Sequence, residues 1–316
     1  MSVPGPDISV IMPCYNSEQF IERSLSSVWA QTFEDFEIII VNDGSTDTTA
    51  EILGAVTDPR AKVINQPNLG VSAARNTGIS ESSGKYISFL DADDSWSPYF
   101  LATMINTLRK HPEAGLAYCG WQNIGVKGPR AKPFIPPDYE NNEKLKSLLT
   151  TCPWPIHAVT VLKSAIVGHK GFDTALTNAE DYKLWLEIAG HYPIVRVPEV
   201  FAYYYFHQEG QASQNAAVAA ISHLKVKRDF IRRRPELVKK LGAEFIQKVT
   251  YGQLVEKAYD CYWARDVVNA RQLFQAAIKS GCVKFADLKY LLPCLLPLCV
   301  HKKLIRLADA HEGPKP

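Results

Sequence analysis

Short apolar runs alternate with amphipathic segments over the first hundred residues. Residues 8–12, 36–41 and 86–90 are rich in β-branched and aromatic side chains, which is typical of buried strands in a mostly parallel sheet. Between and after them, apolar residues recur at helical spacing in residues 21–28 and 101–108, and Ser97-Pro98 predicts the start of the second of these helices. This order predicts a doubly wound α/β domain, whose ligands bind beyond the ends of the strands.

The pattern changes twice further along the chain. Residues 127–142 contain four prolines among polar residues and predict a surface loop, after which a strand at 157–162 and a helix from about Tyr182 continue the α/β pattern. From residue 216 onward the chain is helical in pattern and basic. We therefore expect two domains, residues 1–215 and a helical extension of residues 216–316.

Charge supports the same division. The whole chain of 316 residues has a net charge of +2, but residues 1–215 carry 16 basic and 24 acidic side chains, whereas residues 216–316 carry 19 and 9. An acidic domain needs a metal ion or well-placed cations to bind an anionic substrate, and the basic extension suits an anionic surface.

The cysteine pattern argues against a disulfide scaffold. The seven cysteines form no CxxC pair, so we expect neither a disulfide framework nor a cysteine-based zinc site, and a reducing compartment fits best. The first residues show no basic region followed by a long apolar stretch, so we expect no signal peptide and a cytoplasmic location.

Acidic residues follow two of the predicted strands. Asp43 ends the run FEIIIVND, and Asp91 and Asp93 follow the run YISFL. Two carboxylates separated by one residue after a buried strand suit a shared Mg²⁺ or Mn²⁺ ion. The alternative is that Asp43 caps a turn and that Asp91–Asp94 is a solvated turn.

Two other phosphate-binding motifs are absent from the sequence. Gly78 and Gly84-Lys85 have the wrong spacing for a P-loop, no Ser or Thr follows the lysine, and no GxGxxG follows a strand. Kinase, ATPase and classical dinucleotide-binding functions therefore lose their main support.

Six segments, taken in order, resemble the motifs of the family 2 glycosyltransferases. They are ISVIMPCYN, IIIVNDGSTDTT, NLGVSAARNTGI, FLDADD, the GFD at residues 171–173 and AEDYKLWLEIA at residues 179–189. The resemblance covers about residues 7–213 and implies an inverting nucleotide-sugar transferase with a GT-A-like fold, a mixed and mostly parallel sheet with helices on both faces.

The resemblance also implies roles for individual residues. Pro13 and Tyr15 would line the nucleotide base, Asp43 would bond the uracil or ribose, and Asn68 and Arg75 would lie along the same wall. Asp93 would be the direct metal ligand, and Asp91 would lie nearer the ribose or a metal-bound water. From the residue type alone, a lone arginine in a helix such as Arg75 usually forms a surface salt bridge.

The Glu180-Asp181 pair matches the position of the catalytic base. Inversion is a single displacement, so one carboxylate must take the acceptor's proton on the face opposite the leaving diphosphate, and the resemblance assigns that role to Asp181. Glu180 and Trp185 would lie on the acceptor side. Without the family pattern, two acids at the start of a helix are explained by the helix dipole.

His207 fits the place of a histidine that approaches the diphosphate or the metal, with a structural role as the alternative. The Q-x-x-R-W motif of processive members is absent, which favours single additions over polymer synthesis.

The basic extension has one further feature. Residues 225–240 contain eight basic side chains, and the apolar run at residues 291–300 is too short to span a bilayer. It suits a peripheral position on the anionic cytoplasmic face of a membrane, or alternatively a solvated helix face and a buried helical hairpin. A nucleic-acid partner is not expected, because no recognised binding motif accompanies the basic run.

We therefore expect a Mn²⁺- or Mg²⁺-dependent transferase that uses a UDP-sugar and a saccharide or lipid-linked saccharide acceptor in cell-surface polysaccharide biosynthesis. The alternatives are a sugar-phosphate nucleotidyltransferase, whose glycine-rich loop is missing, and a catalytically silent nucleotide-sugar-binding or membrane scaffold protein.

Overall fold

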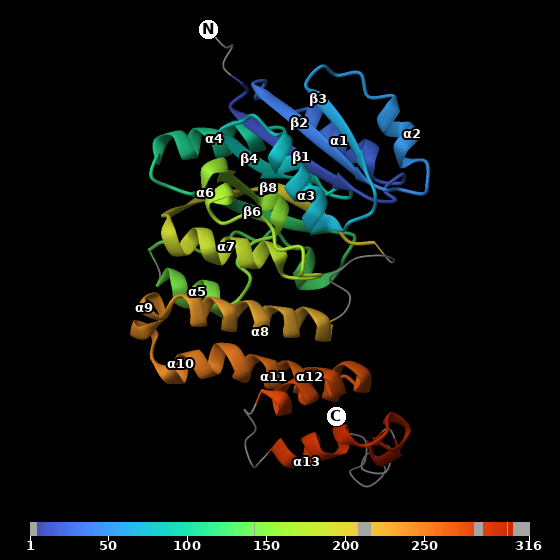
Figure 1. Cartoon of the computed structure of the whole chain (residues 1–316), viewed down its shortest axis with the longest axis vertical. Coiled ribbons are helices and arrows are strands. Elements are labelled where there is room, and N and C mark those ends of the chain that lie inside the picture. Colours follow the sequence, from blue (N-terminus) through green and yellow to red (C-terminus); the bar gives the residue numbers. More distant parts are fainter. Residues whose placement is uncertain (1–4, 142, 208–215, 281–286, 302, 306–316) are drawn as a thin grey trace. The chain divides into compact units, whose positions relative to one another are not determined.

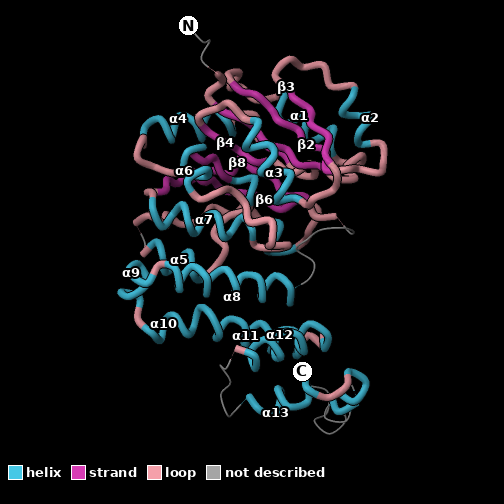
Figure 2. The backbone as a smooth tube through the Cα atoms, in the orientation of Figure 1, coloured by secondary structure: helices cyan, strands magenta, loops and turns pink. Residues whose placement is uncertain are grey.

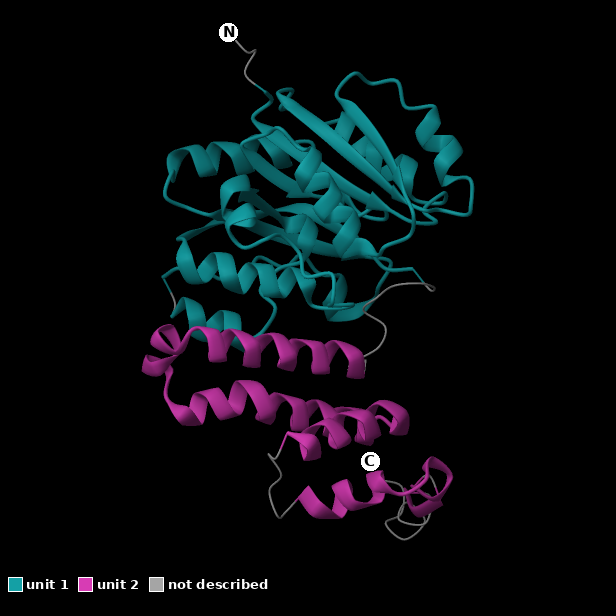
Figure 3. Cartoon of the chain, in the orientation of Figure 1, with its two compact units in different colours: residues 1–211 teal, residues 212–316 magenta. Residues whose placement is uncertain are grey.

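The computed structural model describes residues 5–141, 143–207, 216–280, 287–301 and 303–305. The chain divides into two compact units, residues 1–211 and 212–316 (Figure 3). Unit 1 holds the sheet and its helices, and the described part of unit 2 consists of helices and turns (Figures 1 and 2).

Unit 1 is built around one eight-stranded sheet. The strand order is β3-β2-β1-β4-β7-β6-β8-β5. Strands β3, β2, β1 and β4 are parallel, as are β6 and β8, whereas β7 and β5 pair antiparallel with their neighbours. The strands are β1 (Ile8–Cys14), β2 (Phe36–Asp43), β3 (Ala61–Gln66), β4 (Tyr86–Phe89), β5 (Ser95–Trp96), β6 (Leu116–Ile124), β7 (Val159–Leu162) and β8 (Ile194–Tyr205).

Helices accompany the sheet throughout the described part of unit 1. They are α1 (Ile21–Trp29), α2 (Thr49–Gly54), α3 (Val71–Glu81), α4 (Phe100–Lys110), α5 (Lys144–Thr150), α6 (Lys163–Gly168) and α7 (Glu180–His191), with 3₁₀ turns at Gly128–Ala131 and Ile156–Ala158. Helix α4 starts two residues later than Ser97-Pro98 predicts. The reason is that β5, which pairs with β8, ends at Trp96, and residues 97–99 form the turn between β5 and α4. The strand predicted at 157–162 begins at Val159, after a 3₁₀ turn.

The order in which the strands are added to the sheet reverses at β1. The chain runs outward from β1 through β2 to β3 and then returns to β4 on the other side of β1. Because crossovers between parallel strands are right-handed, this reversal places α1 and α3 on opposite faces. The switch point between β1 and β4 is where an open α/β sheet binds its ligand.

Unit 2 has a hydrophobic core of its own, formed by buried residues of α8, α11, α12 and α13 together with Cys294. Its elements are α8 (Ala216–Arg233), α9 (Pro235–Val238), α10 (Ala243–Gln247), α11 (Gln253–Trp263), α12 (Val267–Lys279) and α13 (Leu288–Leu291), with a π-helical turn at Lys248–Gly252 and 3₁₀ turns at Lys239–Leu241 and Leu292–Leu295. None of the described helices has the length and hydropathy needed to cross a bilayer.

Candidate active site

The acidic turn after β4 lies at the switch point of the sheet. Strand β4 ends at Phe89 beside β1, so Asp91 and Asp93 emerge where the strand order reverses. A carboxylate oxygen of Asp93 lies 2.8 Å from His207 Nε2, and the His207 ring stacks on Phe20 at 4.6 Å. The structure thus brings Asp93 and His207 together from positions 114 residues apart.

The electrostatics of this turn favour a cation. Burial, together with the neighbouring charges of Asp94 and Asp91, raises the pKa of Asp93 to about 6. Negative charge is therefore concentrated in a partly desolvated place. The ligand types available there are carboxylate oxygens and one imidazole nitrogen, a set that suits Mn²⁺ or Mg²⁺.

Arg75 connects the acidic turn to the first residue of α7. It sits in α3 with 3% of its surface exposed. Its guanidinium donates to both oxygens of Asp91, at 2.8 and 3.1 Å, and to Glu180 at 2.7 Å. Burial works against the charge of Arg75, but Asp91 and Glu180 outweigh it and raise its pKa further. Because its guanidinium bonds to these two acids, Arg75 orients them.

The Glu180-Asp181 pair begins α7 from a strained position. Ala179, the residue before the helix, has the left-handed conformation with φ 63°, which costs a non-glycine residue about 1–3 kcal/mol and is frequent at functional sites. Asp181 accepts a hydrogen bond from the Tyr182 backbone N–H at 2.6 Å. Burial and the charge of Glu180 raise the pKa of Asp181 to about 7, a value that suits a general base near neutral pH.

Trp185, which the resemblance places on the acceptor side, lies one turn after Asp181 in α7. Its side chain is fully buried, with 0% exposure. Helix α7 turns Leu184, Trp185 and Ile188 toward the core, and a side chain one turn after Asp181 therefore packs inside. The acceptor-side role expected of Trp185 stays a prediction.

The residues expected along the nucleotide lie at or just after the ends of β1, β2 and β3. Pro13 is buried within β1, whereas Tyr15 and Asn68 are exposed. Asp43 ends β2, and its carboxylate accepts hydrogen bonds from Gln66 Nε2 and from the backbone N–H groups of Leu69 and Gly70. These three bonds hold the loop before α3 and leave part of the carboxylate's acceptor capacity for a ligand.

The comparisons with known proteins agree with this architecture. Residues 9–161 match the family described as Glycosyl transferase family 2. Over these residues the chain belongs to glycosyltransferase family 2.

Among relatives of this family 2 chain is an uncharacterized glycosyltransferase of Haemophilus influenzae, 34% identical over 220 residues that cover 64% of this chain and 66% of the relative. A chondroitin synthase of Escherichia coli is 28% identical over 243 residues, 72% of this chain and 33% of the relative. The chain thus spans between 19% and 66% of the length of curated relatives that it matches.

Solved structures share the GT-A-like fold of this family 2 chain. A crystal structure of S. aureus TarS 1-349 in complex with UDP-GlcNAc aligns with a TM-score of 0.66 and 19% identity, covering 85% of this chain and 79% of that one. The mannosyltransferase PcManGT from Pyrobaculum calidifontis, in complex with GDP-Man and Mn²⁺, aligns with a TM-score of 0.61 and 20% identity, covering 91% and 79%.

The family 2 domain also contains a buried ion pair that motif reasoning missed. Asp94 and His157 are almost fully buried, and His157 Nδ1 lies 3.0 Å from Asp94 Oδ2. Burial opposes the charge of His157, but Asp94 outweighs it and raises the pKa of this histidine. The other carboxylate oxygen of Asp94 accepts from the Tyr205 backbone N–H at 3.0 Å. Asp94, the third acid of the DADD segment, could have been noticed in the sequence. Nothing in the sequence near His157 marks this histidine as the partner of Asp94.

Proposed function

We propose that the chain is a metal-dependent, inverting hexosyltransferase that moves a sugar from a nucleotide sugar to an acceptor hydroxyl group. The observation that carries this proposal is the bridge made by Arg75, which joins Asp91 of the acidic turn to Glu180 beside Asp181. The buried guanidinium group of Arg75 thereby connects the candidate metal site to the residue beside the candidate base.

Asp93, Asp91 and His207 would hold Mn²⁺ or Mg²⁺. The concentration of carboxylates around Asp93 and its raised pKa support this, since a divalent cation would stabilise the ionised form of this carboxyl group. The Mn²⁺ in the PcManGT complex supports it as well. When bound, the ion stabilises the charge that develops on the departing diphosphate.

Asp181 would act as the general base. As the acceptor oxygen attacks the anomeric carbon, its proton passes to the Asp181 carboxylate, a new carbon–oxygen bond forms, and the bond to the diphosphate breaks with inversion. Nucleoside diphosphate leaves with the electron pair. Arg75 and Glu180 would act as positioning residues that hold Asp91 and the start of α7.

The donor would lie across the ends of β1 and β2. Pro13 and Tyr15 would line the base, Asp43 would accept a hydrogen bond from the uracil or ribose, and Asn68 would extend the same wall. The UDP-GlcNAc in the TarS complex supports a UDP-sugar. We assign residues 1–215 to the transferase domain and residues 216–316 to its extension.

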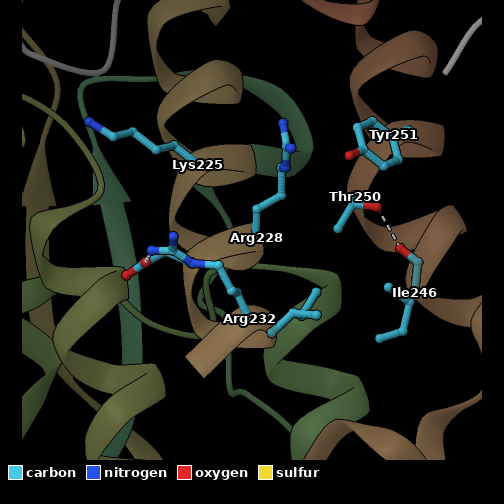
Figure 4. A pocket seen from close by; sticks show the side chains of 8 residues that line it. Lys225, Arg228, Arg232, Ile246, Thr250 and Tyr251 are labelled. Atoms are coloured by element: carbon cyan, nitrogen blue, oxygen red, sulfur yellow. Dashed lines mark hydrogen bonds and ion pairs between the residues drawn. The ribbon is translucent and has the colours of Figure 1, made fainter. Parts of the chain in front are cut away.

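The acceptor would be a saccharide or lipid-linked saccharide in cell-surface polysaccharide biosynthesis, and the similarity to a chondroitin synthase supports a saccharide. Unit 2 would hold the enzyme peripherally on the anionic cytoplasmic face of a membrane. It contains a cavity of about 470 Å³, whose lining includes Lys225, Arg228, Ile246 and Tyr251 together with Arg232 and Asp229, which form an ion pair (Figure 4). Lys225 and Arg228 supply positive charge that suits phospholipid headgroups.

Calorimetry with UDP tests the metal site. Wild-type protein should bind UDP only weakly without Mn²⁺ and tightly with it, and Asp93→Ala should lose the gain that Mn²⁺ brings, because the ion loses a ligand. If the two proteins had the same affinity for UDP and the same dependence of that affinity on Mn²⁺, Asp93 would not be a metal ligand.

Product analysis separates the alternatives. Release of UDP from a UDP-sugar without acceptor indicates a transferase, whereas release of pyrophosphate from a sugar phosphate and a nucleoside triphosphate indicates a nucleotidyltransferase. Binding of a UDP-sugar with no turnover in either assay indicates a silent binding protein.

A further inference from the structure

A second cluster of metal-binding side chains lies at the opposite end of α7 from Asp181. Glu187 and His191 are four residues apart on α7 and therefore share one face of the helix. His169 follows the last residue of α6, and helix α6 packs against α7. The three residues thus meet where α6 ends against the last turn of α7.

Their geometry is close to that of a three-ligand metal site. One ligand atom from each of the three side chains lies within 4.8 Å of the other two. The rings of His169 and His191 have centroids 4.7 Å apart. Zinc–nitrogen bonds of about 2.0–2.1 Å place two ligands of a tetrahedral ion roughly 3.3 Å apart, so the ligand atoms would have to approach one another by up to about 1.5 Å when an ion binds.

The surroundings orient the cluster. His191 Nδ1 lies 2.9 Å from the backbone oxygen of Glu187, so this nitrogen is the protonated one and Nε2 is left as the ligand, an arrangement common among metal-bound histidines. Glu187 is 5% exposed, whereas His191 is exposed. An ion would therefore be held by a buried carboxylate and reached from solvent past His191.

Electrostatics favour a cation at this end of α7. The carboxyl terminus of a helix carries partial negative charge from its free carbonyl groups, and Glu187 adds a full negative charge. Positive charge bound here is stabilised by both.

We propose that His169, Glu187 and His191 form a Zn²⁺ site that joins the end of α6 to the end of α7. Two imidazoles and one carboxylate select Zn²⁺ over Mg²⁺ or Ca²⁺, which prefer oxygen ligands, and three protein ligands leave a position for water. Ten residues of helix, about 15 Å, separate His191 from Asp181. The site is therefore distinct from the acidic turn and acts as a clamp on the helix whose first turn carries the proposed base.

The test measures Zn²⁺ binding to the full chain, without a histidine tag, by calorimetry and by metal analysis after gel filtration. All proteins carry Asp93→Asn, so that an ion at the acidic turn does not contribute. The parent should bind one Zn²⁺ per chain. His191→Ala and His169→Ala should each weaken binding by at least the roughly 10- to 100-fold that losing an outer-shell partner causes. Co²⁺ should give the visible absorption of a tetrahedral site in the parent only.

The matched control is His111→Ala, which removes a half-exposed histidine at the end of α4 and should leave binding unchanged. Circular dichroism confirms that the variants are folded. Absence of stoichiometric Zn²⁺ in the parent, or equal binding by the parent and the His169→Ala/His191→Ala double variant, would overturn the proposal. Because metal content is the readout, either result is independent of transferase activity.

Discussion

Asp181 combines three properties at the scale of a single residue: a raised pKa, a position two residues after a strained Ala179, and a neighbour, Glu180, that is held by Arg75. Asp181→Asn should leave UDP binding nearly intact and lower turnover by roughly 100- to 10,000-fold, because the amide is similar in shape but takes no proton. Steady-state kinetics and calorimetry on one preparation measure both.

The same residue determines a dependence on pH. A base must be deprotonated to act, so wild-type kcat should fall as the pH is lowered through about 7, the pKa of Asp181. The residual rate of Asp181→Asn should lack this step. If folded Asp181→Asn protein turned over at the wild-type rate, Asp181 would not be the base. Glu180→Gln would then be the next variant to measure.

The Asp94–His157 pair makes a prediction about stability. His157→Leu leaves the Asp94 carboxylate buried without its cationic partner, and breaking a buried pair in this way costs about 3–5 kcal/mol. Urea unfolding measures the loss. Asp94→Leu combined with His157→Leu should cost clearly less than the sum of the two single changes, and strict additivity would show that the pair does not interact.

At the scale of elements, the contact of α3 with β1 depends on a residue without a side chain. A Cβ atom at Gly78 would lie 2.5 Å from Cγ2 of Ile11, so Gly78→Ala forces the helix away from the sheet. We expect a loss of about 1–3 kcal/mol in unfolding free energy. Because α3 also carries Arg75, UDP-sugar turnover should fall as well.

Gly54→Ala is the matched control, since a Cβ atom there meets nothing within 4 Å. It should be neutral or slightly stabilising, as alanine favours a helix. A folded Gly78→Ala protein with an unchanged free energy of unfolding would show that α3 and β1 can accommodate the added methyl group beside Ile11.

At the scale of the whole molecule, the basic extension should bind anionic vesicles. Each Lys or Arg near such a surface contributes about 1 kcal/mol, so Lys225→Glu with Arg228→Glu should weaken binding to phosphatidylglycerol vesicles by roughly 30-fold or more. Sedimentation at low and high salt measures this, and binding should weaken with salt.

Lys110→Glu with Lys132→Glu gives the control. It makes the same change of charge at exposed positions of unit 1 and should have a smaller effect. Equal loss in both double variants would mean that net charge alone controls binding, and no binding by the wild type would mean that the extension serves another purpose.

Local pattern was sufficient for strands β1, β2, β4 and β7, for helices α1, α4 and α7, and for the acids themselves, whereas strands β3, β5, β6 and β8 were not predicted. The runs that became β1, β2 and β4 are buried strands, the chain has the predicted GT-A-like fold, and the acids of DADD and of Glu180-Asp181 follow a strand and begin a helix as expected. The reason is that strand and helix periodicity, and the position of an acid after a strand, are encoded within about ten residues of sequence.

Contacts between distant segments were decided only by the tertiary structure. Arg75 contacts Glu180, which is 105 residues away in the sequence, and His207 contacts Asp93, which is 114 residues away. Asp94 pairs with His157, and the sequence around His157 looks like the start of any strand. That Trp185 lies on the buried face of α7 was likewise decided by what packs against the helix. The sequence alone therefore determined which chemical groups the protein has and on which elements they lie. Folding decided which of them meet, because pairing across a hundred residues is set by strand order and helix packing rather than by local spacing.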